Sequence, residues 1–166
     1  MNKSTRLILA AAMAAMALAA CKKQEAAVPA ADQAQAAPAL PAKDDNNGWK
    51  QYLQTVVGQN LGSVTNNPYL YYLPPESDPD FQASYDRQVE SVTTSISRGV
   101  QPGNMLAFGS SASAKMADLI QAAFKGVAPN SMKGVRVLYI GEAADNDRVK
   151  AVIEPTGADY VFVEAK

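Results

Sequence analysis

The alternation of apolar runs and amphipathic segments in the last third of the chain constrains its fold most. Apolar runs at 105–108, 135–140 and 160–163 are separated by two segments whose apolar residues recur at helical spacing. This β-α-β-α-β order predicts parallel strands joined by right-handed crossovers. The middle run is apolar on both faces apart from Arg136, which is typical of a strand covered on both sides.

Two helices are predicted ahead of this alternating part. The first follows the Asp/Asn cluster at 44–47 and ends near the first of two glycines, Gly58. The second has Asp78 as its N-cap and Pro79 at its first helical position, and it ends before Gly99. The sequence therefore predicts an α/β domain, with two N-terminal helices followed by β-α-β-α-β and a small, mostly parallel three-stranded sheet.

The first 21 residues are organised like a secretory signal. Lys3 and Arg6 make its beginning basic, residues 7–20 are uncharged, and Cys21, the only cysteine, follows Leu18-Ala19-Ala20. The uncharged run of 14 residues is shorter than the roughly 20 residues that a membrane-spanning helix needs. The segment is thus expected to be an export signal and not a membrane span.

This arrangement resembles the lipobox of bacterial lipoproteins. The resemblance implies that residues 1–20 are a signal peptide and that the Cys21 thiol receives a diacylglycerol. It also implies that the new amino group is acylated, for example with palmitate, so that the lipid holds the protein on a membrane. In that family an Asp after the cysteine retains the protein in the inner membrane. Lys22 follows here, which implies the periplasmic leaflet of the outer membrane in the cell envelope.

Composition divides the mature chain into a tether, residues 21–47, and one globular domain, residues 48–166. Between Ala26 and Ala42, nine of 17 residues are Ala and three are Pro, with no aromatic residue. Such a segment cannot bury enough apolar surface to offset the entropy of ordering it. The remaining residues suffice for a single domain with a hydrophobic core.

Charge and residue types exclude several function classes. Without Lys3 and Arg6, 13 basic and 16 acidic side chains remain, a formal net charge of −3, which argues against nucleic-acid binding. The chain has no histidine, so His-based metal sites and Ser-His-Asp or Cys-His catalysis are excluded. No residue pattern indicates a cofactor, and no sequence feature selects a pair of catalytic carboxylates.

Two loops that follow predicted strands hold candidate ligand-binding residues, because ligands of open parallel sheets tend to bind beyond the strands' carboxyl ends. The first loop could hold an anion at a helix N-terminus, although it lacks the Walker pattern; alternatively, Ser111 or Ser113 caps that helix. The acidic second loop could hold Ca²⁺ or Mg²⁺, or Asp145 or Asp147 could cap a helix; no metal is predicted, because the spacing is not that of an EF-hand. The candidates are Gly109, Ser110, Ser111, Ser113, Glu142, Asp145 and Asp147.

A tyrosine-rich segment precedes the second predicted helix. Tyr69, Tyr71 and Tyr72 lie between Pro68 and Pro74. An exposed cluster of this kind would suit recognition of a protein or a glycan. Alternatively, the segment is extended and its rings fill gaps over the sheet.

Three functions stay open from the sequence. The one we expect is a non-enzymatic accessory module that binds an envelope protein or glycan, because the chain has a long tether and no catalytic constellation. The alternative is a small-ligand-binding domain or hydrolase that uses the strand-end loops near Ser110 and Asp145. A purely structural envelope protein is the third.

Overall fold

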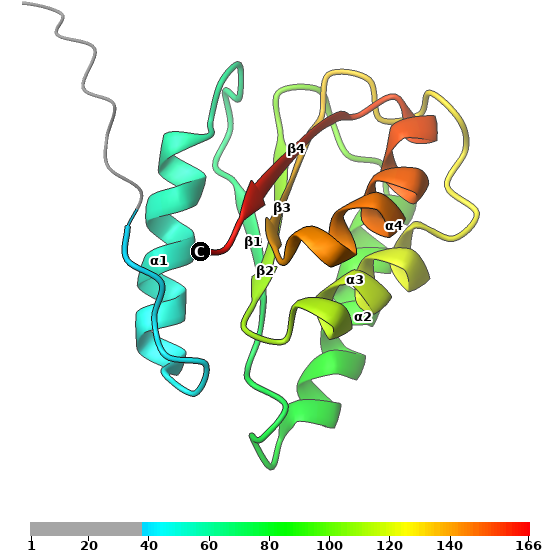
Figure 1. The fold of residues 1–166 in the computed structure, drawn as a ribbon. Coiled ribbons are helices and arrows are strands. Elements are labelled where there is room, and N and C mark those ends of the chain that lie inside the picture. The colour runs from blue at the N-terminus through cyan, green and yellow to red at the C-terminus, as the bar shows by residue number, and fades with distance from the viewer. Residues whose placement is uncertain (1–37) are drawn as a thin grey trace, which may run out of the picture. The chain divides into compact units, whose positions relative to one another are not determined.

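The structure is a computed structural model that describes residues 38–166. The predicted signal peptide, Cys21 and most of the predicted tether lie outside the described residues. No helix within the described range is both long enough and apolar enough to cross a membrane. Figure 1 shows the arrangement of the elements. In chain order they are α1 (Asn46–Gln59), β1 (Tyr69–Leu73), α2 (Phe81–Ser97), β2 (Met105–Ser110), α3 (Ser113–Phe124), β3 (Arg136–Gly141), α4 (Ala143–Ile153), a 3₁₀ turn (Glu154–Thr156) and β4 (Asp159–Glu164).

The sheet has four parallel strands in the order β1-β2-β3-β4. The α/β class and the parallel sheet predicted from the sequence are confirmed, but the count of three strands is wrong. The tyrosine-rich segment is itself a strand, β1, and it separates the two helices that were predicted to be consecutive. Prolines flank this strand, which an edge position tolerates because one side of an edge strand donates to no ladder.

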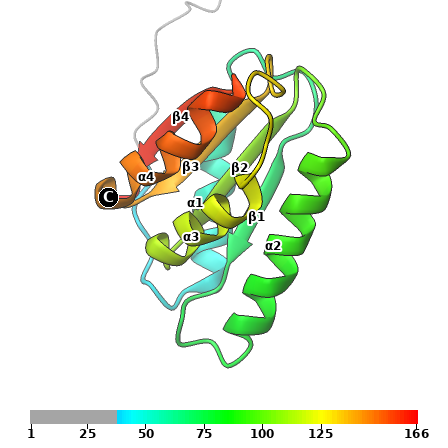
Figure 2. The same ribbon diagram turned by 90° about the vertical axis from the view of Figure 1, so that its right-hand side faces the viewer.

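Helices cover both faces of the sheet in unequal numbers. Each strand is added on the same side of the one before it, so the right-handed crossovers place α2, α3 and α4 on one face. Figures 1 and 2 show these three helices together, with α1 alone on the opposite face. Because the strand order never reverses, the sheet has no topological switch point, the place where ligands of such sheets usually bind.

Alternating side chains along the strands build two cores. Phe108 and Tyr139 face the three helices, whereas Leu138 and Ile140 face α1. The close approach of α1 depends on Gly109, since a Cβ there would lie 2.3 Å from Leu53 Cδ2. Gly109, which was predicted to be a ligand-binding residue, therefore packs against α1.

Both ends of α1 are tied to their surroundings. At its start the Asp45 carboxylate accepts a hydrogen bond from the backbone N–H of Gly48 at 2.8 Å, and Trp49 Nε1 donates to the Ala42 carbonyl at 3.0 Å. At its end Arg136 Nη1 donates to the carbonyl of Asn60 at 2.8 Å. The helix runs through Gly58 to Gln59, so the break that the sequence predicted at this glycine is wrong; a single glycine weakens a helix without ending it.

The other helices begin at residues different from those predicted. Asp80, not Asp78, is the N-cap of α2, because the Asp78 carboxylate accepts the Asp80 N–H within a turn that contains Pro79. Ala112 precedes α3, and Glu142 precedes α4. Of the residues predicted as caps of these two helices, Ser113 and Asp145 bond to each other across the helices instead.

Candidate functional site

The two predicted strand-end loops meet at the carboxyl edge of the sheet. Ser113, the first residue of α3, donates its Oγ hydrogen to Oδ2 of Asp145 at 2.6 Å. The backbone N–H of Glu142 donates to the same Ser113 Oγ at 2.8 Å. The structure therefore brings Ser113, Glu142 and Asp145 together, as the topology of a parallel sheet requires.

Tyr139, which sequence reasoning placed only in the core, completes this contact. Its hydroxyl lies 2.8 Å from Ser113 Oγ. Because the single hydroxyl proton of Ser113 is donated to Asp145, Tyr139 must be the donor to Ser113. Burial raises the pKa of Tyr139 to about 12, so its phenol keeps that proton at neutral pH.

Arg148, a second residue that the sequence did not point to, occupies the other side of the carboxylate. Its Nε and Nη2 donate to Asp145 Oδ1 at 3.0 and 2.8 Å. The guanidinium also donates to the Ala114 carbonyl at 2.7 Å and pairs with Asp118. Both oxygens of Asp145 are therefore occupied, and α4 is joined to α3.

These four residues, Ser113, Tyr139, Asp145 and Arg148, form what we call the inter-helix network. Ser113 is 4 % exposed and Tyr139 is fully buried, so a substrate cannot reach their hydroxyls. The carboxylate beside Ser113 also accepts two hydrogen bonds from the Arg148 guanidinium, so both of its oxygens are engaged within the protein. The geometry therefore favours a structural role for this network.

The remaining residues of the first loop are also engaged or buried. Ser110 Oγ donates to the Leu73 carbonyl and accepts the Ala112 N–H, both at 2.9 Å. The buried Ser111 Oγ has no hydrogen-bond partner in the described part of the chain. The hollow beside it measures about 40 Å³, which is the space of about one water molecule.

The acidic residues of the second loop do not converge. Glu142 and Asp147 are exposed, whereas Asp145 is buried in the inter-helix network. Across residues 38–166 no group of three His, Cys, Asp or Glu side chains is placed to hold a metal ion. The separation follows from helix geometry, because neighbouring positions of α4 point in different directions.

The three candidate tyrosines of β1 have different environments. Tyr71 is 6 % exposed and stacks on Phe108 with ring centroids 5.1 Å apart. Tyr72 lies on the α1 face, where its hydroxyl donates to Asn46 Oδ1 at 2.6 Å. Only Tyr69 is open to solvent, at 52 %. The three rings do not form an exposed cluster: the segment is extended, as the alternative interpretation had it, and Tyr71 and Tyr72 pack on opposite faces of the sheet.

Tyr69 borders a hollow at the edge of the sheet, which we call the Tyr69 hollow. Its volume is about 320 Å³, and it lies where α2 ends and the chain turns into β2. Arginine, amide and hydroxyl groups gather around it, so it offers several hydrogen-bond donors and acceptors next to an aromatic ring. The polar residues that line it with Tyr69 are Ser95, Arg98, Gln101 and Asn104.

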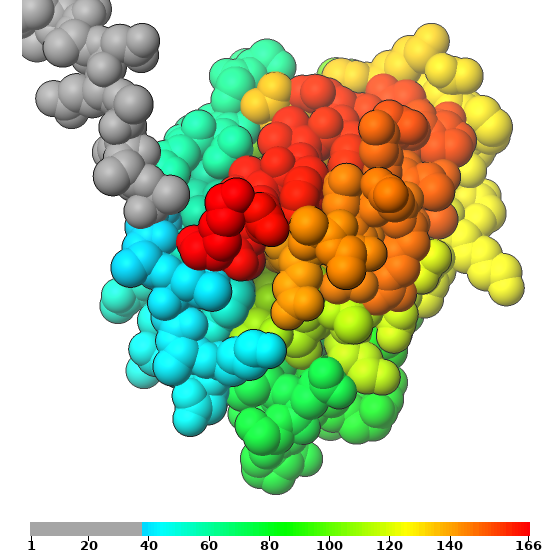
Figure 3. All heavy atoms as spheres, in the orientation of Figure 1, coloured from blue at the N-terminus to red at the C-terminus, as the bar shows by residue number. Residues whose placement is uncertain are grey.

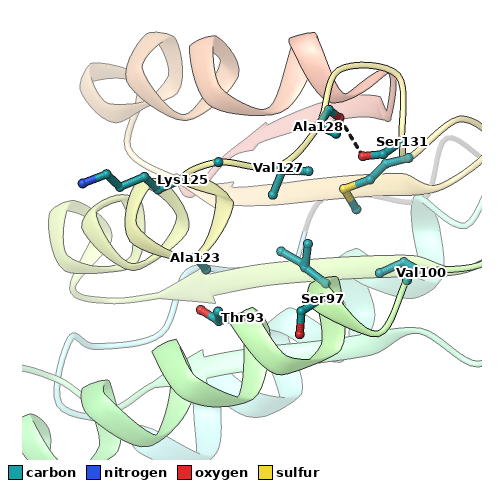
Figure 4. Close-up of a pocket in the computed structure, with 12 residues that line it drawn as sticks. Thr93, Ser97, Val100, Ala123, Lys125, Val127, Ala128 and Ser131 are labelled. Atoms are coloured by element: carbon teal, nitrogen blue, oxygen red, sulfur yellow. Dashed lines mark hydrogen bonds between the residues drawn. The ribbon is translucent and has the colours of Figure 1, made fainter.

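A second hollow of about 340 Å³ lies on the other side of the end of α2, against α3. Figure 4 shows the residues around it, with the Ser131 hydroxyl bonded to the Ala128 carbonyl at 2.7 Å. Apolar side chains, among them Val100 and Val127, form much of its lining. Both hollows share Gly99 and Val100, so the end of α2 is flanked by a hollow on each side.

No protein-family model, curated protein or solved structure matches this chain. Its architecture is that of a singly wound parallel α/β domain with an extra helix on the second face. Function must therefore be argued from the inter-helix network and the Tyr69 hollow themselves.

Proposed function

We propose that this chain is a lipid-anchored cell-envelope protein whose folded domain is a non-enzymatic accessory module. The domain binds an envelope glycan or protein through the Tyr69 hollow. Support for the anchor is Cys21 directly after Leu18-Ala19-Ala20, with a basic and then an uncharged segment upstream. Lys22 favours the periplasmic leaflet of the outer membrane.

The observation that carries the binding role is the exposure of Tyr69 beside hydrogen-bonding groups. Large aromatic side chains are normally buried, and Tyr71 on the same strand follows that rule. Tyr69 instead leaves its ring open at a hollow that Arg98 also lines. An aromatic ring beside convergent polar groups is a common feature of recognition sites.

The chemistry of the hollow favours a sugar over a protein surface. A sugar ring offers C–H groups that pack on an aromatic face and hydroxyls that bond to amide and guanidinium groups. Gln101 and Asn104 supply the amides. A standard protein interface buries about 800 Å² on each partner, whereas this hollow is compact and sets amide and guanidinium groups beside an aromatic ring.

The anchor is tested with Cys21→Ser in cells that are fed a labelled fatty acid. We expect the label to be lost and uncleaved precursor to accumulate, because the thiol is the proposed lipid acceptor. Normal processing and labelling of this variant would contradict the lipoprotein assignment.

Binding is tested by co-sedimentation of the full-length protein with isolated peptidoglycan sacculi, the cell-wall glycan. We expect Tyr69→Ala to weaken retention about tenfold, because aromatic residues at binding sites commonly contribute more than 1 kcal/mol. Leu61→Ala is the matched control, since Leu61 is also exposed, at 37 %, but lies outside the hollow. Both variants should unfold at the wild-type temperature.

A protein partner is tested in parallel by crosslinking in living cells with an affinity tag after Lys166. If sacculi retain nothing and one envelope protein is captured by wild type but not by Tyr69→Ala, the partner is a protein. Equal binding of glycan and equal capture of protein by both variants would contradict a role for the Tyr69 hollow.

A further inference from the structure

The two edges of the sheet differ in their protection against pairing. Pro68 and Pro74 flank β1, and proline blocks extension of a ladder because it lacks an N–H. In contrast, β4 runs over Asp159–Glu164 without Pro, Gly or Lys, the residues that commonly interrupt edge pairing. Figure 3 shows β4, in red, on the visible face of the molecule. It lies between the blue segment that precedes α1 and the orange helix α4.

The hydrogen-bond pattern identifies the backbone groups on the free edge of β4. Asp159 N donates to the Val135 carbonyl and Ala165 N donates to the Gly141 carbonyl. Odd-numbered residues of β4 therefore pair with β3, since pairing alternates along a strand. The N–H and C=O groups of the even-numbered residues, Tyr160, Phe162 and Glu164, point outward.

The side chains next to this edge are apolar on both faces of the sheet. Tyr160 and Phe162 pack against the core under the three helices, and Val161 and Val163 pack against the α1 side. All four are only partly buried. The edge thus combines a backbone that pairs with no other strand of residues 38–166 with apolar surface that a further strand would cover.

We propose that β4 pairs antiparallel with β4 of a second copy of this chain. With the two-fold axis at Phe162, the outward groups of Tyr160 face those of the second copy's Glu164, and the two Phe162 residues face each other. On the other face Val161 lies opposite the second copy's Val163. The contact joins the two sheets into one of eight strands.

The charges of β4 fit a second copy in this direction. In the antiparallel arrangement the carboxylate of Glu164 lies opposite Tyr160, and Asp159 lies opposite Ala165, so no like charges meet. A parallel arrangement would stack Glu164 on Glu164. Because the outward row is symmetric about Phe162, the same surface serves both copies, as a two-fold interface requires.

The first test is the mass of the full-length protein in detergent by sedimentation velocity over a range of concentrations. We expect wild type to form a reversible dimer. Glu164→Pro removes an outward N–H from each copy and should raise the dissociation constant about tenfold or more. Glu164→Ala retains that N–H and should leave the dimer intact.

The second test keeps the proposal falsifiable if the proline variant does not fold. Directly opposed residues of a hydrogen-bonded antiparallel pair have Cα atoms about 5.5 Å apart, which suits a disulfide. Phe162→Cys should therefore give a covalent dimer under oxidising conditions that is lost on reduction. Tyr69→Cys, exposed at the other edge, should stay a single chain.

A single-chain mass for wild type at every concentration overturns the proposal. Equal masses for Glu164→Pro and Glu164→Ala, with both variants folded, also overturn it. So does equal crosslinking of Phe162→Cys and Tyr69→Cys.

Discussion

Ser113 Oγ donates a 2.6 Å hydrogen bond to the buried carboxylate of Asp145 and so fastens the beginning of α3 to the first turn of α4. A serine beside a carboxylate resembles part of a hydrolytic site. Here the carboxylate is also held by Arg148, and the serine also accepts from Tyr139. The contact joins elements far apart in the sequence, and its loss should be measured as lost stability.

Asp145→Ala should lower the free energy of unfolding by about 1–3 kcal/mol, because it leaves the buried Ser113 hydroxyl without its acceptor and removes one of the two carboxylates that pair with Arg148. Unfolding in urea measures the change. Asp147→Ala, at an exposed position two residues along the same helix, is the matched control and should stay within about 0.5 kcal/mol of wild type. Similar costs for the two variants would contradict a stabilising network.

Gly141→Ala should also destabilise the domain, by about 1–3 kcal/mol. The added Cβ would lie 2.4 Å from Tyr139 Oη and 2.7 Å from Ser113 Oγ, so the hydroxyls would have to separate. Gly58→Ala is the opposite case, because no atom lies within 4 Å and the residue is in an exposed part of α1. It should stabilise by about 0.5–1 kcal/mol. Thermal unfolding of both variants distinguishes crowding from a general intolerance of alanine.

Tyr71→Ala should cost about 3–5 kcal/mol, because it removes a buried ring that stacks on Phe108. Tyr69→Ala, two residues away on the same strand, should change stability by less than about 0.5 kcal/mol. Chemical denaturation of the two variants separates a core role from a binding role. A large stability loss for Tyr69→Ala would mean that its effect on partner capture reports folding.

Stability should fall at alkaline pH because buried tyrosines resist ionisation. Burial raises the pKa of Tyr139 to about 12, from 10.0 for a free side chain. The folded state holds this proton more tightly than the unfolded chain does, so the contribution is complete below pH 10 and is lost as pH rises toward 12. Tyr72, with its pKa raised to about 12 by burial and then by Asp78 and Asp45, acts in the same window.

The measurement is the free energy of unfolding across that pH window, with tyrosinate absorbance recorded alongside. Tyr139→Phe should flatten the alkaline decline, although it lowers stability at neutral pH by removing a hydrogen bond to Ser113. Ionisation of every tyrosine near pH 10 in the folded protein would contradict the effect of burial.

Local patterns in the sequence were sufficient to predict most helices and three of the four strands. The runs that became β2, β3 and β4 are apolar over several residues, which is typical of strands in a parallel sheet. β1 was not predicted as a strand, because its tyrosines are amphipathic and prolines flank it. Neither feature separates an edge strand from a loop that covers the sheet.

The candidate site was predictable only where chain topology alone determines it. Ser113 and Asp145 follow adjacent parallel strands, so the strand order alone places their two loops at the same edge of the sheet. The participation of Tyr139 and Arg148 depends on how α3 and α4 pack. The exposure of Tyr69 depends on where α2 ends against β1. No periodicity in a single sequence carries this tertiary information.

The solitary position of α1 on its face of the sheet also has a mechanical consequence. Any pull that arrives along the chain ahead of residue 38 enters the domain at the start of this helix, where Trp49 holds Ala42. The contacts of α1 would then break one after another from its first residue to its last. The last of them would be the hydrogen bond from Arg136 to the Asn60 carbonyl. A force applied through the chain ahead of residue 38 is therefore expected to detach α1 from the sheet before it loads α2, α3 and α4.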